Sequence, residues 1–122
     1  MNKSKNEINF EPITFITCFV LFFFIVTSIF DISVTITMML EHQDIFLQQE
    51  LNPLFVWSRT HNIPLILDPS IWINFATGLF YLQSYFNRKI SKRWKMTYLV
   101  LTCVLIVFSA THLMGGYSWL VG

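Results

Sequence analysis

Three long apolar stretches, separated by polar segments, dominate the pattern of this chain. They cover Ile13–Phe30, Ile71–Phe86 and Met96–Leu113, and they lack the strict alternation of a strand in a membrane barrel. A helix of about 18 apolar residues is long enough to cross the ~30 Å hydrocarbon core of a bilayer. The pattern therefore predicts an all-α integral membrane protein with three transmembrane helices, over about residues 13–40, 70–87 and 95–114.

The composition agrees with this class of protein. Of the 122 residues, 54% are hydrophobic and only 12% are charged, whereas a soluble domain is about 25% charged. We therefore expect one multi-pass membrane domain over residues 1–122. In a bacterial or archaeal cell it would lie in the plasma or inner membrane.

Basic residues are concentrated in the short link between the second and third stretches, residues 87–95. The five cations of this link are Arg88, Lys89, Lys92, Arg93 and Lys95. Because Lys and Arg collect on the cytoplasmic side of membrane proteins, the link and the N-terminus, with Lys3 and Lys5, are predicted to lie inside. The loop 41–69 and the C-terminus are then outside. This topology explains the cluster better than nucleic-acid binding does, so no nucleic-acid partner is expected.

The outer loop and the ends of the spans carry helix signals of their own. Asn52-Pro53 followed by the apolar segment Leu54–Trp57 predicts a short helix lying at the membrane interface. Asp68-Pro69-Ser70 predicts the start of the second span. Gly115-Gly116 predicts the end of the third span.

One polar group from each predicted span falls near the outer surface. By helical rise, Asp31 lies ~27 Å above Ile13, at the inner end of the first span. His112 lies ~24 Å above Met96 in the third span. Asn74 enters from outside and lies within ~6–8 Å of the same boundary. Ionisable groups within spans are costly and usually face protein or water, so these positions are candidates for a functional site.

We expect Asp31, Glu50 and His112 to form the core of that site. The polar groups predicted around them are Thr35, Asn52, Asn74 and His61. Carboxylate and imidazole ligands suit zinc or another divalent metal, and the same three groups could act as general acid and base. The simpler interpretation is structural: Asp31 pairs with His112, while Glu50 pairs with Arg59 or caps backbone donors. The sequence leaves both interpretations open and identifies no cofactor.

The segments Asp31-Ile-Ser-Val-Thr35 and Glu50-Leu-Asn-Pro53 resemble a family of small, uncharacterised membrane proteins of bacteria and archaea. Those chains carry an aspartate and a threonine four apart in the first span, followed by Glu-x-Asn-Pro. The resemblance covers about the first half of the chain and leaves His112 outside the match. This chain has a longer link between the motifs and a proline-rich stretch before the second span. The resemblance implies a multi-pass membrane protein and marks site positions, but it implies no mechanism.

Three functions remain open. The first is a small accessory or binding subunit of a membrane assembly, with an outward-facing polar site. The second is a metal-dependent membrane enzyme that uses Asp31, Glu50 and His112, and the third is a viral pore former. Because three spans bury little of their own surface, the expected partners are the lipid bilayer and either further copies of the chain or a larger membrane complex.

Overall fold

Three long helices and a folded connecting segment make up the computed structural model, which describes residues 11–50 and 52–121. The elements are α1 (Pro12–Glu41), α2 (Gln43–Gln49), α3 (Pro53–Thr60), the 3-10 helix η1 (Leu65–Leu67), α4 (Pro69–Asn87) and α5 (Lys92–Val121). No strand occurs in the described residues, and the all-α prediction is confirmed. Lys3 and Lys5, which entered the topology prediction, lie outside this part of the chain.

Two of the helices, α1 and α5, are long and apolar enough to cross a membrane. Each has 30 residues, or ~45 Å at the rise of an α-helix, against a hydrocarbon core of ~30 Å. With 19 residues, α4 is also long enough to cross a membrane. Polar residues such as Asn74 and Gln83, however, keep its mean hydropathy below the level that marks α1 and α5 as candidate spans. By length and composition the structure thus contains two candidate spans, where the sequence predicts three.

Capping side chains begin α3 and α4 where the sequence predicts. The side chain of Asn52 caps α3 by accepting two of its first backbone N–H groups. Asp68 caps α4 through the backbone N–H of Ser70 at 2.9 Å. The prediction for Gly115-Gly116 was wrong, because α5 continues through both residues to Val121. Both glycines instead pack closely against α1: an added Cβ atom would lie 2.9 Å from Oδ1 of Asp31 at Gly115 and 2.5 Å from the ring of Phe30 at Gly116.

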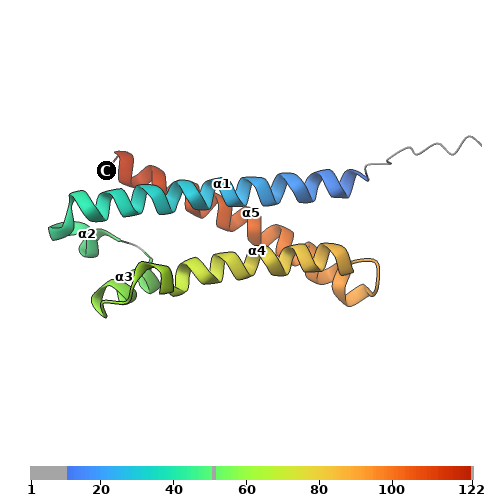
Figure 1. Cartoon of the computed structure of the whole chain (residues 1–122). Helices are drawn as coiled ribbons and strands as arrows, with labels where there is room; N and C mark the ends of the chain where they lie inside the picture. The colour runs from blue at the N-terminus through green and yellow to red at the C-terminus, as the bar shows by residue number, and fades with distance from the viewer. Residues whose placement is uncertain (1–10, 51, 122) are drawn as a thin grey trace, which may run out of the picture.

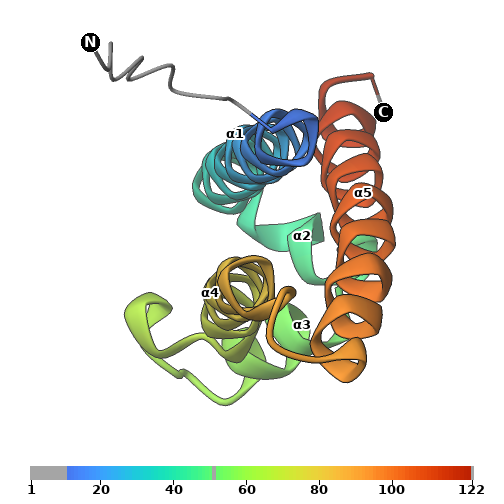
Figure 2. The ribbon, with the colours of Figure 1, turned by 90° about the vertical axis from the view of Figure 1, so that its right-hand side faces the viewer.

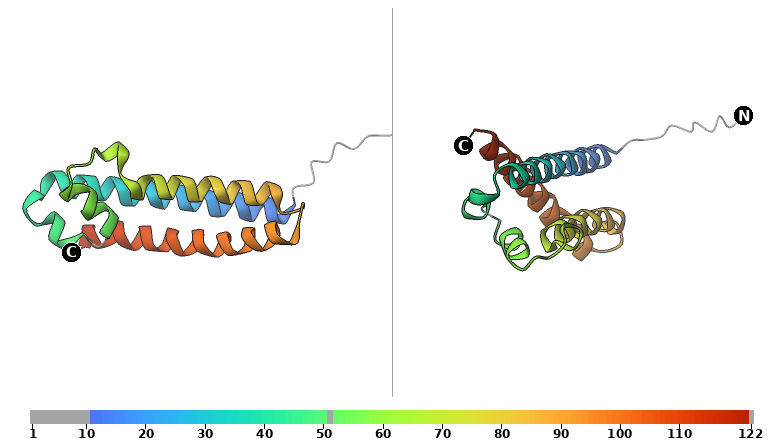
Figure 3. Two further views of the ribbon diagram at one scale, coloured as in Figure 1. Left: turned by 90° about the horizontal axis from the view of Figure 1, so that it is seen from below. Right: turned by 60° about the vertical axis from the view of Figure 1, so that its left-hand side comes forward.

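The long helices α1 and α4 run roughly parallel, and α5 crosses behind both on a diagonal (Figure 1). In the end view, α5 extends from beside α4 to beside α1, and it contacts both helices, which contact each other little (Figure 2). Figure 3 shows α2, α3 and the C-terminal end of α5 gathered at one end of the three helices. We call this the loop end, and we call the opposite end, with residues 88–91 and the start of α1, the link end. Polar groups near the loop end of all three helices can therefore meet.

Tyrosine and threonine side chains join the three helices in their middle and near the link end. The Tyr98 hydroxyl lies 2.6 Å from the Thr17 hydroxyl, and Thr102 donates to the Tyr81 hydroxyl at 3.1 Å. The rings of Tyr81 and Tyr98 stack with their centroids 5.4 Å apart. Both tyrosines are buried, next to a small apolar core that includes Leu105. Interhelical hydrogen bonds of this kind are typical of helices that associate within lipid.

Candidate functional site at the loop end

Asp31, Asn74 and His112 connect the three long helices at the loop end. The ring Nδ1 of His112, on α5, lies 2.7 Å from Oδ2 of Asp31 on α1. Its Nε2 lies 3.1 Å from Oδ1 of Asn74 on α4. The side chains of Asp31 and His112 are only 22% and 15% exposed. The three groups that the sequence places at similar depth are therefore in direct contact.

These contacts define the role of the His112 ring. Nδ1 faces a carboxylate oxygen, which can only accept while it is ionised, so Nδ1 carries a proton. Nε2 faces the side-chain amide of Asn74, whose oxygen accepts from a protonated Nε2 and whose NH2 group, with the amide turned over, donates to a bare one. The contact with Asp31 is an ion pair when His112 is protonated and a hydrogen bond from the neutral ring to the carboxylate otherwise. The structural pairing that the sequence offered as the simpler interpretation is thus present.

Close packing between α1 and α5 positions the Asp31 carboxylate. Thr35, one turn further along the same face of α1, donates to Oδ1 of Asp31 at 3.5 Å. On α5, a Cβ atom at Gly115 would lie 2.9 Å from that same oxygen. Gly115 follows His112 by three residues and so shares its helix face. The glycine leaves the space that the carboxylate occupies.

A cavity of about 50 Å³, lined by both polar and apolar side chains, lies beside Asp31 and His112. Its polar side chains come from α1, α4, α5 and the segment around the start of α3: Asp31, Thr35, Glu50, Asn52, Ser70, Asn74 and His112. Six of the seven site residues predicted from the sequence therefore line one cavity. Its volume suits a small ion or a few water molecules.

The segment before α3 closes one side of the cavity. Oε1 of Glu50 accepts a hydrogen bond from the backbone N–H of Asn52 at 2.9 Å, so Glu50 does cap a backbone donor, as one interpretation expected. The Asn52 side chain in turn caps α3, which Pro53 begins. Both motifs that carry the family resemblance thus contribute to the lining of the same cavity, one through Asp31 and Thr35 and the other through Glu50 and Asn52.

Aromatic rings hold this segment against the end of α5. Phe46, on α2, is 1% exposed and stacks on Trp119 of α5 with centroids 5.3 Å apart. It also meets the edge of Phe55, which lines the cavity from α3, at 5.8 Å. The three rings fix α2 and α3 over the loop end of α5.

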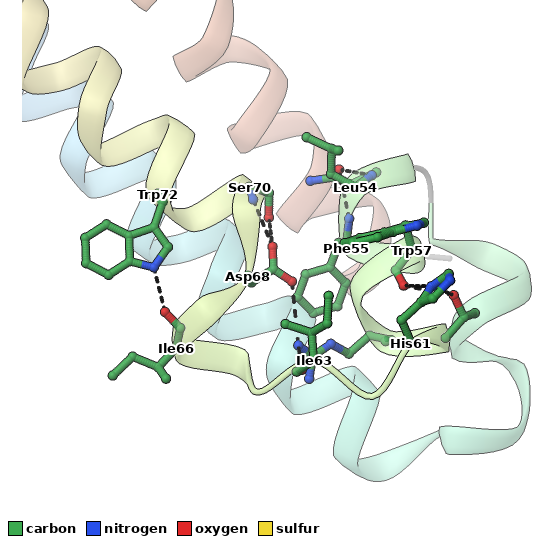
Figure 4. Close-up of polar contacts among 12 residues, drawn as sticks. Leu54, Phe55, Trp57, His61, Ile63, Ile66, Asp68, Ser70 and Trp72 are labelled. Atoms are coloured by element: carbon green, nitrogen blue, oxygen red, sulfur yellow. Dashed lines mark hydrogen bonds and ion pairs between the residues drawn. The ribbon is translucent and has the colours of Figure 1, made fainter.

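His61 does not belong to the cavity. Its ring lies against Trp57 at 4.7 Å, and its Nδ1 is 2.8 Å from the backbone oxygen of Trp57, on the exposed side of α3 (Figure 4). The sequence placed His61 in the right loop, but it could not show which side of the short helix faces the three long helices.

Arg59, considered above as a partner of Glu50, pairs with Asp68. Its Nη2 lies 3.7 Å from Oδ2 of Asp68 and donates to the backbone oxygen of Ile63 at 2.6 Å. Asp68 is fully buried and accepts from both the backbone N–H and the hydroxyl of Ser70 (Figure 4). This second ion pair anchors the end of the loop to the start of α4, next to the cavity.

The atoms around the cavity that could bind a cation are mainly oxygens. Among the described residues, no group of three His, Cys, Asp or Glu side chains is placed to hold a metal ion. Both ring nitrogens of His112 are also engaged. Carboxylate, amide and hydroxyl oxygens remain, and such ligands favour hard cations over zinc.

Two contributors to the site were missed from the sequence, Gly115 and Ser70. A glycine three residues after an ionisable group within a span is a usable signal of close packing against that group's partner. Ser70 was noted only as part of a helix start, and nothing in its sequence context shows that it also lines a cavity.

The basic link lies at the opposite end of the helices. Glu11, at the start of α1, pairs with Lys89 at 2.9 Å and with Arg88 at 2.8 Å. The hydrogen bond and charge of Lys89, assisted by Arg88, lower the pKa of Glu11 below its ordinary value. The other three cations of the link, Lys92, Arg93 and Lys95, are exposed.

No protein-family model, curated protein or solved structure matches the chain. The family resemblance of the motifs Asp31–Thr35 and Glu50–Pro53 therefore stays a prediction.

Proposed function

We propose that the chain is a membrane protein with three spans, α1, α4 and α5, and that it serves as a non-enzymatic accessory or binding subunit. In this proposal the loop end faces outward and its cavity binds a small cation. The observation that carries the proposal is the cavity itself, in which polar side chains from all three long helices and from the loop converge.

Exposed apolar side chains on all three long helices support the three spans. More than half of the side-chain surface is exposed for Phe15 and Phe22 on α1, Phe75 and Phe86 on α4, and Val107 on α5. Soluble proteins rarely expose apolar surface on this scale. Because α4 shares the property, it is the third span in this proposal despite its polar residues, of which Asn74 faces the cavity.

The charged residues indicate the orientation of the chain in the membrane and the class of ligand that the cavity would bind. The basic link at the link end favours the cytoplasmic side, which leaves the cavity outside. Asp31 and Glu50 contribute two negative charges to the cavity, and His112 compensates at most one of them. With either charge state of His112, the lining attracts a cation, and its oxygen donors suit a hard one.

Binding is favoured over metal-dependent catalysis. An enzyme of the kind considered above would use His112 as a metal ligand, but its Nδ1 and Nε2 both face protein oxygens. Freeing either nitrogen would break a contact that joins two helices.

The test is cation-dependent stability of the purified full chain in detergent. Thermal unfolding is followed by circular dichroism in sodium, potassium, ammonium, magnesium or calcium chloride, with choline chloride at equal ionic strength as the reference. A cation that binds only the folded chain at 100 times its Kd adds about 2.7 kcal/mol of stability. Glu50→Gln removes a cavity carboxylate, and Glu41→Gln, which removes an exposed carboxylate at the end of α1, is the matched control.

The proposal predicts that at least one cation raises the midpoint above that in choline. The rise should persist in Glu41→Gln and disappear in Glu50→Gln. The proposal is contradicted if no cation raises the unfolding midpoint of the wild-type chain above that in choline chloride. It is also contradicted if the midpoint of Glu50→Gln rises as much as that of the wild type.

A further inference from the structure

We infer that the groove between α4 and α5 at the link end binds one anionic phospholipid, with its phosphate at Lys92 and Arg93 and an acyl chain along α5. This inference rests on the proposed membrane placement of α4 and α5. It concerns a surface at the opposite end of the molecule from the cavity.

The five cations of the basic link differ in their counter-charge and in their place relative to the groove. Arg88 and Lys89 share the single carboxylate of Glu11, which lies less than 3 Å from both and offsets half of their combined charge. The other three, Lys92, Arg93 and Lys95, are exposed, and the described residues offer none of them an ion pair. Of the five, Lys92 and Arg93 line the groove, so their charge is available to a ligand there.

These two cations stand at one end of an apolar groove of about 660 Å³. The groove is lined by Phe80 of α4 and, along α5, by Met96, Thr97, Val100 and Leu101. Its surface is therefore amphipathic, with positive charge at the link end and hydrocarbon beyond it. An anionic head joined to an apolar tail has the complementary pattern.

The dimensions of the groove fit one leaflet. From Lys92 to Leu101 the helix advances nine residues, or ~13.5 Å. Half of a ~30 Å hydrocarbon core is ~15 Å, so a tail lying along the groove would reach about the middle of the bilayer. The ring of Phe80 meets that of Trp94 at 6.1 Å, which places a tryptophan near the level where the head would lie.

A lipid tail fits this groove better than a helix from a second copy of the chain. Helices that pack in membranes approach each other through small residues. Here the walls are formed by Phe80, Met96, Val100 and Leu101, which are large and partly or mostly exposed. Flexible hydrocarbon can fill the spaces between such side chains, whereas a rigid helix cannot approach them closely.

Native mass spectrometry of the purified full chain in detergent can test this inference. The chain is titrated with phosphatidylglycerol and with phosphatidylcholine of identical acyl chains. Lys92→Gln combined with Arg93→Gln removes the two cations that line the groove, and Arg88→Gln combined with Lys89→Gln removes the same charge from the pair that shares Glu11 and lies outside the groove. Val100→Trp fills the groove and leaves every cation in place.

The wild-type chain should bind one phosphatidylglycerol more tightly than phosphatidylcholine. At ~1 kcal/mol for each cation near an anionic surface, losing Lys92 and Arg93 should weaken phosphatidylglycerol binding about 30-fold. The Arg88 and Lys89 variant should retain the preference, and Val100→Trp should lose binding although its charges are intact. Equal binding of the two lipids, or equal losses in the two charge variants, would overturn the site.

Two further results separate this inference from the proposed function. Glu50→Gln should leave lipid binding unchanged, and the Lys92 and Arg93 variant should keep the cation-dependent rise in stability. If the chain forms dimers that Val100→Trp abolishes, the groove is a contact between copies and the lipid assignment is wrong.

Discussion

Substitution of Asp31 or His112 removes the contact that joins α1 to α5 at the loop-end site. With His112 protonated, the pair is two unit charges 2.7 Å apart, which attract by ~6 kcal/mol at an effective dielectric constant of 20. The side chains are 22% and 15% exposed, so solvent screening and the cost of desolvation offset most of that energy. A hydrogen bond to a charged group contributes about 1.5–3 kcal/mol net. We therefore expect Asp31→Asn and His112→Gln each to cost about 2 kcal/mol.

A double-mutant cycle measures the interaction itself. The free energy of unfolding of the full chain in mixed micelles is obtained from circular dichroism as the fraction of sodium dodecyl sulfate increases. We expect a coupling energy of about 1.5–2 kcal/mol between the two substitutions, and a change below about 0.5 kcal/mol for the exposed control Glu41→Gln. If the losses simply add to within about 0.5 kcal/mol, the ion pair does not hold α1 to α5 and the reasoning is refuted.

Two further predictions concern packing and pH. Gly115→Ala should destabilise the chain by about 1–3 kcal/mol, because the new Cβ would lie 2.9 Å from Asp31 Oδ1. Gly78→Ala, whose Cβ meets its nearest neighbour at 3.7 Å, should cost less than about 1 kcal/mol in the same assay; equal losses would contradict the assigned close contact. Because Lys89 lowers the pKa of Glu11 from 4.5, its ion pairs stabilise the chain above pH 4.5 and are lost as pH falls through the lowered pKa. The thermal midpoint should fall further on acidification for the wild type than for Glu11→Gln, and parallel curves would contradict this.

The depth of polar groups along the helices could be predicted because a helix rises by a constant amount per residue. This regularity is why Asp31, Asn74 and His112 could be placed in one layer without a structure. The starts of α3 and α4 were predictable for a similar reason, since caps act over two or three residues. Both depend only on local geometry.

Contacts between helices could not be predicted from the sequence in the same way. The partner of Tyr98 is Thr17, 81 residues away, and nothing in either segment identifies the other. Gly115 was interpreted as a helix end, because its local sequence is the same whether the glycine stops a helix or admits a neighbouring carboxylate. His61 was placed near the site because the rotation of a short helix about its axis depends on packing rather than on sequence spacing. Composition is similarly a weak guide to the number of spans, since α4 is made less apolar both by Asn74, which lines the cavity, and by the exposed Gln83.

The most direct measurement of the central proposal is the accessibility of cysteines on the two sides of α4. Thr60→Cys and Ser91→Cys are suitable because both positions are exposed and flank this helix. The native Cys18 and Cys103 are also exposed and would first be replaced by serine. With a membrane-impermeant maleimide, the three-span topology predicts labelling at position 60 in intact cells and at position 91 only after permeabilisation. Labelling of both positions from the same side would show that α4 does not cross the membrane, and the reversed pattern would place the cavity inside.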